Sequence, residues 1–321
     1  INIGANLGAM ASSAQLVVGI PFIYLLIGMT VLTLVLEVFL SYKTYAKYLK
    51  YLTFSLLAYI IVAFIVKQDW SLILRDTFIP RISFDEGYIL NIVAILGTTI
   101  SPYLFFWQAN EEVEEEVATK KLRMYGAGIP KIHKKDIHEM RIDTVIGMFF
   151  SNLVMFFIII TAASTLYRNG IHTIFTADQA ASVLQPIAGQ WAFLLFALGI
   201  IGTGLLSVPV LSGSASYALS ETFGWKEGLY RKFQKAHGFY GVITVATLVG
   251  LLVNFTSIEP FRMLYYSAVI NGIVAPPLMI LILVTANKKD VMGKYKNSVW
   301  SNVFGIFITA VMFLSAVLLV W

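Results

Sequence analysis

The sequence predicts an all-α integral membrane protein, and three observations lead to this fold class. Hydrophobic residues make up 58% of the 321 residues and charged residues only 13%, whereas soluble domains average about 45–50% and about 25%. The apolar residues occur in runs of about 20, the length that one helix needs to cross a bilayer. These runs are too long and too continuously apolar for tilted barrel strands.

Nine transmembrane helices are predicted, because backbone groups in lipid must be hydrogen-bonded within their own element. The predicted spans are residues 1–19, 20–40, 48–66, 88–108, 144–166, 190–213, 238–257, 261–285 and 299–320. A tight turn at Gly19 and Pro21 separates the first two spans. We therefore expect a single transmembrane domain over residues 1–321, embedded in the lipid bilayer.

The basic residues predict the orientation of these spans. Most of the 23 lysine and arginine residues lie in four loops, at 41–50, 119–143, 223–237 and 286–298. The alternate loops hold only Lys67, Arg75, Arg81, Arg168 and Arg262. By the positive-inside rule, the lysine-rich loops face the cytoplasm and the C-terminus lies outside the cell membrane. The net charge of +5 follows from this topology, so we expect no nucleic-acid partner.

The chain opens with Ile1 inside an apolar helix, and no signal peptide precedes it. This favours a sequence whose beginning is missing over processing that exposes Ile1 within a membrane helix.

The fourth span has a proline-centred interruption, Gly97-Thr98-Thr99-Ile100-Ser101-Pro102-Tyr103. Pro102 has no N–H group, so the carbonyl of Thr98 loses its helical donor. Ser101 precedes a proline and is pushed away from helical dihedral angles. A helix broken at mid-membrane exposes backbone oxygens, which transporters use to hold ions. A proline kink healed by serine and threonine side chains is the alternative, and the residues alone do not separate the two.

Other polar residues within or beside the spans are weaker candidates. The run Glu111–Glu116 could form an acidic mouth that attracts cations, although the i,i+4 pair Glu116 and Lys120 favours a solvated helix extension. Glu37 lies inside the second span and could simply reach the cytoplasmic interface. Asn271 is near the middle of the eighth span, where its amide needs a partner; an interhelical hydrogen bond is slightly favoured over a ligand role.

Three stretches resemble bacterial Nramp-type divalent-metal transporters. They are Asn2-Ile3-Gly4-Ala5-Asn6-Leu7-Gly8-Ala9-Met10, the run from Gly97 to Ala109 with the glutamates that follow, and Asn271-Gly272 with Ala275-Pro276-Pro277 and Met292-Gly293. The resemblance covers essentially the whole chain. It implies a LeuT-like fold of two inverted five-helix repeats, of which the nine spans would be helices three to eleven. The first repeat would be incomplete at 1–66, the second would cover about 88–285, and an extra C-terminal helix would cover 299–320.

The resemblance also implies a site. The family's first helix, whose Asp-Pro-Gly-Asn-type break supplies the main carboxylate, has no counterpart in this chain. The remaining metal positions would be Thr98, Ser101, Tyr103 and Asn271, around a helix break at Gly97 and Pro102. In the family's Met-Pro-His motif, Ser101 replaces the methionine and Tyr103 the histidine. Oxygen donors without a thioether suit Mg²⁺ and Mn²⁺, as in the Nramp-related magnesium-transporter branch.

Asn6 stands near the position where classical members carry acidic residues linked to proton movement. It is therefore a proton-path or cavity position by resemblance, and the missing carboxylate puts proton coupling in question.

The function implied by the resemblance is secondary transport of Mg²⁺- or Mn²⁺-type cations by alternating access. The metal would be the transported substrate, with no cofactor and no obligate protein partner. An amino-acid or organic-cation transporter of the same superfold is the alternative, because a fold does not decide a substrate. An enzyme is not expected, since an intramembrane protease would need a Ser–His or paired-Asp arrangement within the spans.

Overall fold

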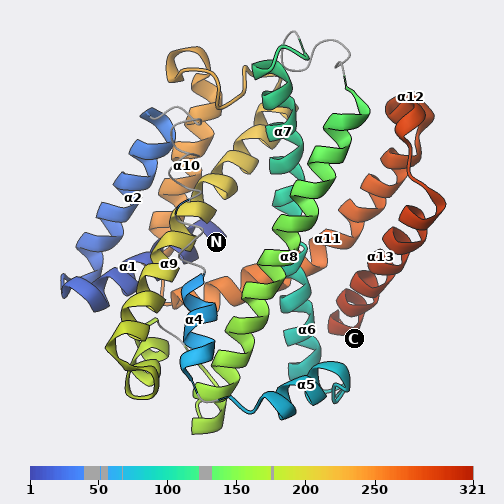
Figure 1. Cartoon of the computed structure of the whole chain (residues 1–321). Helices are drawn as coiled ribbons and strands as arrows, with labels where there is room; N and C mark the ends of the chain where they lie inside the picture. The colour runs from blue at the N-terminus through green and yellow to red at the C-terminus, as the bar shows by residue number, and fades with distance from the viewer. Residues whose placement is uncertain (40–50, 52–56, 67, 123–131, 175–176, 321) are drawn as a thin grey trace. The chain divides into compact units, whose positions relative to one another are not determined.

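A computed structural model describes residues 1–321 except 40–50, 52–56, 67, 123–131, 175–176 and 321 (Figure 1). Every regular element of the described residues is helical, which confirms the predicted all-α class for that part of the chain. The α-helices are α1 (Asn2–Val18), α2 (Phe22–Phe39), α4 (Leu57–Ile65), α5 (Trp70–Phe78), α6 (Glu86–Thr99), α7 (Pro102–Ala118), α8 (Lys134–Thr165), α9 (Ala177–Phe223), α10 (His237–Val253), α11 (Pro260–Asn287), α12 (Lys289–Met292) and α13 (Val299–Val320). Short 3₁₀ turns occur at Tyr167–Asn169, Phe233–Lys235 and Gly293–Tyr295.

Several of these helices are long and apolar enough to cross a bilayer. Within the described residues there are six by length and composition: Phe22–Phe39, Glu86–Ala118, Lys134–Asn169, Leu194–Phe223, Pro260–Asn287 and Val299–Leu318. The apolar helix His237–Val253 is shorter. These helices make the chain a multi-pass membrane protein, whereas the count of nine spans stays a prediction.

Two helices extend well beyond the spans expected from hydropathy. The helix α8 begins at Lys134, inside the loop predicted at 119–143. The helix α9 runs from Ala177 to Phe223, whereas the apolar run covers only 190–213. Hydropathy reports the part of a helix that lipid surrounds, and helical hydrogen bonding continues into polar sequence on either side.

The chain divides into two compact units, which are described separately below. Unit 1 comprises residues 1–77 and 106–263, and unit 2 comprises residues 78–105 and 264–321.

In unit 1, helices α1, α2, α9 and α10 pack together, with α1 and α2 drawn in blue in Figure 1. Their core holds Leu7, Met10, Leu26 and Val208, all fully buried. Small residues bring the helices close: a Cβ atom at Gly4 of α1 would lie 2.6 Å from the carbonyl oxygen of Gly250 in α10. Small residues at helix contacts are typical of membrane proteins, because lipid gives apolar side chains little reason to associate.

In unit 2, α6 packs against α13, and residues of α11 and α13 line a shared apolar groove. Figure 1 shows α13, in dark red, beside α11. The turn between these helices is closed by Asn287 and Asn302, whose side-chain amides donate to each other's oxygens at 2.8 and 2.7 Å. Large apolar side chains of α13, including Phe304 and Phe307, are exposed and suit contact with lipid.

Candidate functional site

The candidate site is the interruption between α6 and α7 in unit 2. The helix α6 ends at Thr99 and α7 begins at Pro102. The intervening Ile100 has non-helical dihedral angles (φ −113°, ψ 73°), and its N–H group still donates to the Leu96 carbonyl at 2.8 Å. Pro102 fits the first position of α7, where a missing N–H group costs nothing. The chain thus leaves one helix and starts another at Ser101, inside the segment that hydropathy assigns to the membrane.

The Ser101 side chain caps the end of α6 from within the interruption. Ser101 is only 4% exposed, and its hydroxyl donates to the carbonyl oxygens of Gly97 at 3.2 Å and Thr98 at 3.0 Å. A serine hydroxyl has one donor and two acceptor lone pairs. With its hydrogen shared between these carbonyls, the Ser101 oxygen keeps its lone pairs available to a cation. Capping the helix and binding a cation are therefore compatible at this residue.

A close crossing of α6 and α11 lies beside the interruption. A Cβ atom at Gly97 would overlap the carbonyl oxygen of Ala268 and the backbone nitrogen of Gly272. A Cβ atom at Gly272 would lie 2.6 Å from the Val93 carbonyl oxygen. Gly97 is therefore needed for backbone contact, in addition to the loosening of the turn expected from the sequence.

The proline pair of α11 adds further backbone oxygens at this crossing. Pro276 and Pro277 lie inside α11 and cannot donate to the carbonyls four residues earlier, those of Gly272 and Ile273. Both helices thus bring carbonyls without their usual helical donors to one place. The sequence pattern did not predict this crossing, although Gly272, four residues before Pro276, was a usable signal.

The other predicted site residues differ in how far they are exposed to solvent. Thr98 is exposed, and Tyr103 and Asn271 are half-buried. Asn271 directly precedes Gly272 and so belongs to the α11 side of the crossing; among the described residues, no hydrogen bond to its amide is found. Asn6 belongs to unit 1, where its amide donates to the carbonyl and side-chain oxygens of Asn2 at 2.9 and 3.0 Å.

Unit 1 contains a buried carboxylate in α2. Glu37 is 5% exposed, so it does not reach solvent as the sequence allowed. One of its oxygens accepts a hydrogen bond from the Ser212 hydroxyl of α9 at 2.9 Å. Its other oxygen has no hydrogen-bond partner in the part of the chain that the structure describes. Glu37 thus joins α2 to α9 inside the protein.

A second buried carboxylate corrects the interpretation of the glutamate run on α7. Glu114 is 7% exposed, whereas the neighbouring Glu115 is exposed. The Oε1 atom of Glu114 accepts from the Tyr217 hydroxyl and from the Leu229 N–H group, the latter at 2.6 Å. Its Oε2 atom accepts from the Tyr230 N–H group at 3.1 Å. A solvated helix extension is therefore wrong for Glu114, which ties α7 to α9 and to the loop after α9.

Three other glutamates of the same run, one exposed and two half-buried, line an acidic cavity of about 360 Å³ in unit 1. Its acidic lining residues are Glu112, Glu115, Glu116, Asp136, Glu139 and Asp143. Lys121 also lines it and forms a 2.8 Å ion pair with Asp136, which raises the pKa of the lysine. Among the described residues, no three histidines or carboxylates are arranged to hold a metal ion. The cavity can attract cations at long range, but it offers no built coordination site.

Comparison with known proteins adds two findings. A family model described as "Natural resistance-associated macrophage protein-like", or Nramp, matches residues 1–321. A divalent metal cation transporter MntH of Caldanaerobacter subterraneus subsp. tengcongensis is 26% identical over 267 residues, which cover 82% of this chain and 58% of the relative. The MntH of Clostridium acetobutylicum is 24% identical over 269 residues, covering 82% and 56%.

A further relative, the uncharacterized membrane protein YcsG of Bacillus subtilis, is 26% identical over 239 residues, covering 74% of this chain and 52% of the relative. The chain thus spans between about half and three-fifths of the length of these curated relatives.

Proposed function

The chain belongs to the Nramp family, and from this membership and the α6–α7 interruption we propose that it forms part of a secondary transporter for divalent metal cations. The observation that carries the proposal is the helix interruption at Ser101, a buried hydroxyl that donates to the carbonyl oxygens of Gly97 and Thr98. The MntH names of two relatives support a divalent metal as the substrate. In this proposal the protein is a transporter rather than an enzyme.

The proposed cation donors are oxygens. Thr98, Ser101, Tyr103 and Asn271 would contribute hydroxyl, carbonyl or amide oxygens, and none of these residues carries sulfur. Oxygen ligands suit hard cations, and Mg²⁺ usually keeps several of its waters when it binds. A serine leaves more room than a methionine for such a partly hydrated ion. We therefore propose Mg²⁺ and Mn²⁺ as the substrates, with Asn6 as a cavity or proton-path position elsewhere.

The wider architecture in this proposal is a LeuT-like one. The nine predicted spans would belong to two inverted repeats in the cytoplasmic membrane, with the lysine-rich loops inside and the C-terminus outside. A helix interrupted at mid-membrane is characteristic of transporters that alternate access around a central site. The interruption at Ser101 supports such a mechanism for the unit that contains it.

The test is metal uptake by the full-length protein in proteoliposomes, with and without Ser101→Met. We expect the wild type to take up Mg²⁺ and Mn²⁺ in competition with each other. Its uptake of Cd²⁺ should be small. The substitution introduces a soft thioether, so preference should shift toward Cd²⁺ and Mn²⁺. Uptake of Mg²⁺ should fall about tenfold or more, the equivalent of about 1.4 kcal/mol in binding.

The matched control is Ser315→Met, which makes the same change on α13, where the hydroxyl donates to the Val311 carbonyl at 2.9 Å. It should leave the metal preference unchanged. A wild type that already prefers Cd²⁺, with no effect of Ser101→Met, would contradict the proposed selectivity. Uptake of an amino acid without any metal uptake would contradict the proposed function itself.

A further inference from the structure

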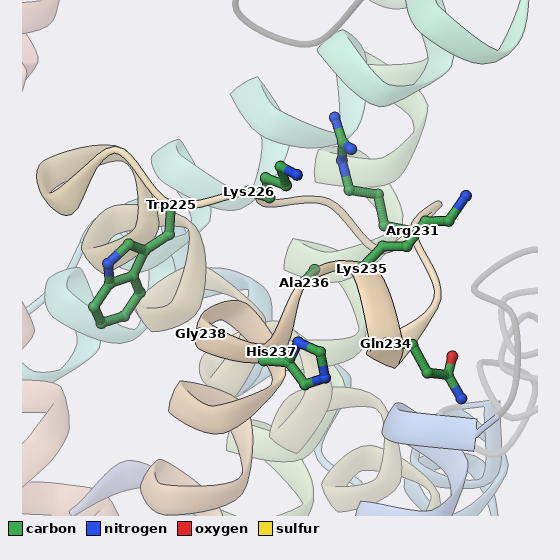
Figure 2. Close-up of a pocket in the computed structure, with 8 residues that line it drawn as sticks. All are labelled: Trp225, Lys226, Arg231, Gln234, Lys235, Ala236, His237 and Gly238. Carbon is green, nitrogen blue, oxygen red and sulfur yellow. The ribbon is translucent and has the colours of Figure 1, made fainter.

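The loop between α9 and α10 surrounds a cavity of about 670 Å³ with a basic lining. Its lining residues, shown in Figure 2, include Lys226, Arg231, Lys235 and His237, and none of them is acidic. Figure 2 shows the side chains of Lys226, Arg231 and Lys235 extending outward from the loop. Three permanent positive charges around one hollow favour an anionic ligand.

The two lysines of this lining, Lys226 and Lys235, are not neutralised by ion pairs within the described part of the chain. Arg231 donates from Nε to the backbone carbonyl of Glu227 at 2.9 Å, and its guanidinium carbon lies 5.0 Å from the centroid of the Tyr230 ring. Its charge is partly offset by the nearby carboxyl groups of Glu227 and Glu114. His237 is the first residue of α10, and its N-terminal end has no side-chain cap. The positive end of the helix dipole therefore adds to the field of the basic side chains.

The cavity lies between a helix long and apolar enough to cross a bilayer and a shorter apolar helix. The apolar helix segment Leu194–Phe223 ends directly before it, and the apolar helix His237–Val253 begins directly after it. Exposed aromatic side chains surround this loop, namely Phe223, Trp225, Tyr230 and Phe233. The rings of Phe223 and Trp225 stack with their centroids 5.2 Å apart. Amphipathic aromatic residues at the ends of membrane helices mark the level of the lipid headgroups.

We propose that this cavity binds the phosphate of an anionic phospholipid headgroup. Lys226, Arg231 and Lys235 supply the charge, and the exposed rings of Trp225 and its neighbours face the upper part of the acyl chains. Basic pockets beside membrane helices are suited to such headgroups. A phosphate in free solution would gain nothing from the aromatic rings, which is why the lipid is the favoured source.

The site has a structural consequence within unit 1. The same loop supplies the N–H groups of Leu229 and Tyr230 that bind the Glu114 carboxylate of α7. A lipid held by Lys226 and Lys235 would therefore stabilise the loop that anchors the end of α7. This inference concerns lipid rather than the transported metal, so it stands independently of the proposed substrate.

The test uses the full-length protein in bilayers that contain spin-labelled phosphatidylglycerol or spin-labelled phosphatidylcholine. We expect the wild type to retain phosphatidylglycerol preferentially in its motionally restricted lipid shell. The double variant Lys226→Gln/Lys235→Gln should weaken that preference about tenfold or more, because each basic residue near an anionic surface contributes about fivefold. The single variants should each show part of the loss.

The matched control is Lys232→Gln, because Lys232 is an exposed lysine of the same loop that does not line the cavity. It should keep most of the wild-type preference. Thermal unfolding in a zwitterionic detergent checks that each variant is folded. Unchanged lipid preference in the folded double variant, or an equal loss in Lys232→Gln, would overturn the site. Displacement of phosphatidylglycerol by inorganic phosphate at equal concentration would overturn the lipid as its ligand.

Discussion

The two compact units bury their polar groups in different ways. In unit 2, the polar groups at the interruption between α6 and α7 are the Ser101 hydroxyl and backbone carbonyls, and all of them are neutral. In unit 1, Glu37 and Glu114 bury carboxylates, and each binds donors from another helix or loop. Neutral oxygens can hold a cation weakly enough to release it, as transport requires. The buried carboxylates join elements within unit 1: both oxygens of Glu114 accept hydrogen bonds from protein donors, and one oxygen of Glu37 does so.

The largest expected effect on stability comes from a substitution at the backbone crossing in unit 2. Gly97→Ala places a Cβ atom against the backbone of Ala268 and Gly272, which cannot move aside as a flexible side chain can. We expect the helices to separate at a cost of about 3 kcal/mol or more, the upper end for overpacked sites. The measurement is thermal unfolding of the purified full-length protein, together with its yield from membranes.

The control for this substitution is Gly147→Ala in α8, where an added Cβ atom meets nothing within 4 Å. Alanine is a better helix former than glycine, so this variant should be slightly more stable, by about 0.5–1 kcal/mol. Equal stability of Gly97→Ala and wild type would show that α6 and α11 do not meet through their backbones.

The next largest effect is expected at the buried carboxylate of unit 1, Glu114. Glu114→Gln removes a charge that accepts three hydrogen bonds, from the Tyr217 hydroxyl and from the Leu229 and Tyr230 N–H groups. Hydrogen bonds to charged groups contribute about 1.5–3 kcal/mol, and the amide can replace them only in part. We expect a loss of about 2 kcal/mol in the free energy of unfolding. Amide hydrogen exchange at Leu229 and Tyr230 should become faster.

Glu115→Gln tests the adjacent, exposed carboxylate on the same helix. It should change the free energy of unfolding by less than about 0.5 kcal/mol, as surface substitutions usually do. If both variants leave exchange at Leu229 and Tyr230 unaltered, then Glu114 does not anchor the loop.

The sequence predicts the helix interruption of unit 2 better than the partners of the buried carboxylates of unit 1. The residues that cause the interruption are close together in the sequence, whereas the partners of each carboxylate are far away in it. Pro102, Ser101 and Gly97 lie within six residues, and the effect of proline on its neighbours is local. Glu114 binds Tyr217 and Leu229, which are 103 and 115 residues away, and Ser212 is 175 residues from Glu37. No local pattern shows which of the five glutamates between residues 111 and 116 faces inward, because that depends on where another helix lies.

The same reasoning explains the partial success with the helices. Most of the predicted spans overlap helices that the structure describes, because burial in lipid requires apolar side chains. The predicted span at 48–66 lies partly outside the described residues. The apolar runs did not give the full length of α9, whose ends lie in less apolar sequence. The crossing of Gly97 with Gly272 was also missed, since it depends on the packing of two helices whose glycines are far apart in sequence.

The smallest expected effect concerns a carboxyl group that is only partly buried, Glu227 in the loop after α9. One of its oxygens is buried without a hydrogen-bond partner in the described part of the chain. Burial is the main cause that raises the pKa of Glu227 to about 7; the carboxylates of Glu221 and Glu114 raise it further, and Arg231 opposes them. Unlike Glu114, Glu227 therefore has no full set of donors to stabilise its charge.

The sign of the pH effect follows from proton binding. Between the ordinary glutamate pKa of 4.5 and the raised value of about 7, the folded protein holds a proton on Glu227 that the unfolded chain releases. Stability from this group is therefore complete below pH 4.5 and is lost as the pH rises through about 7. Glu227→Gln should remove that decline, with a difference below about 1 kcal/mol because the side chain is partly screened by solvent. Unfolding measured from pH 4 to pH 8, beside Glu115→Gln as the control for losing a carboxylate, checks this. A wild-type profile that matches Glu227→Gln across the range would show that the Glu227 carboxyl is hydrated like an ordinary surface group.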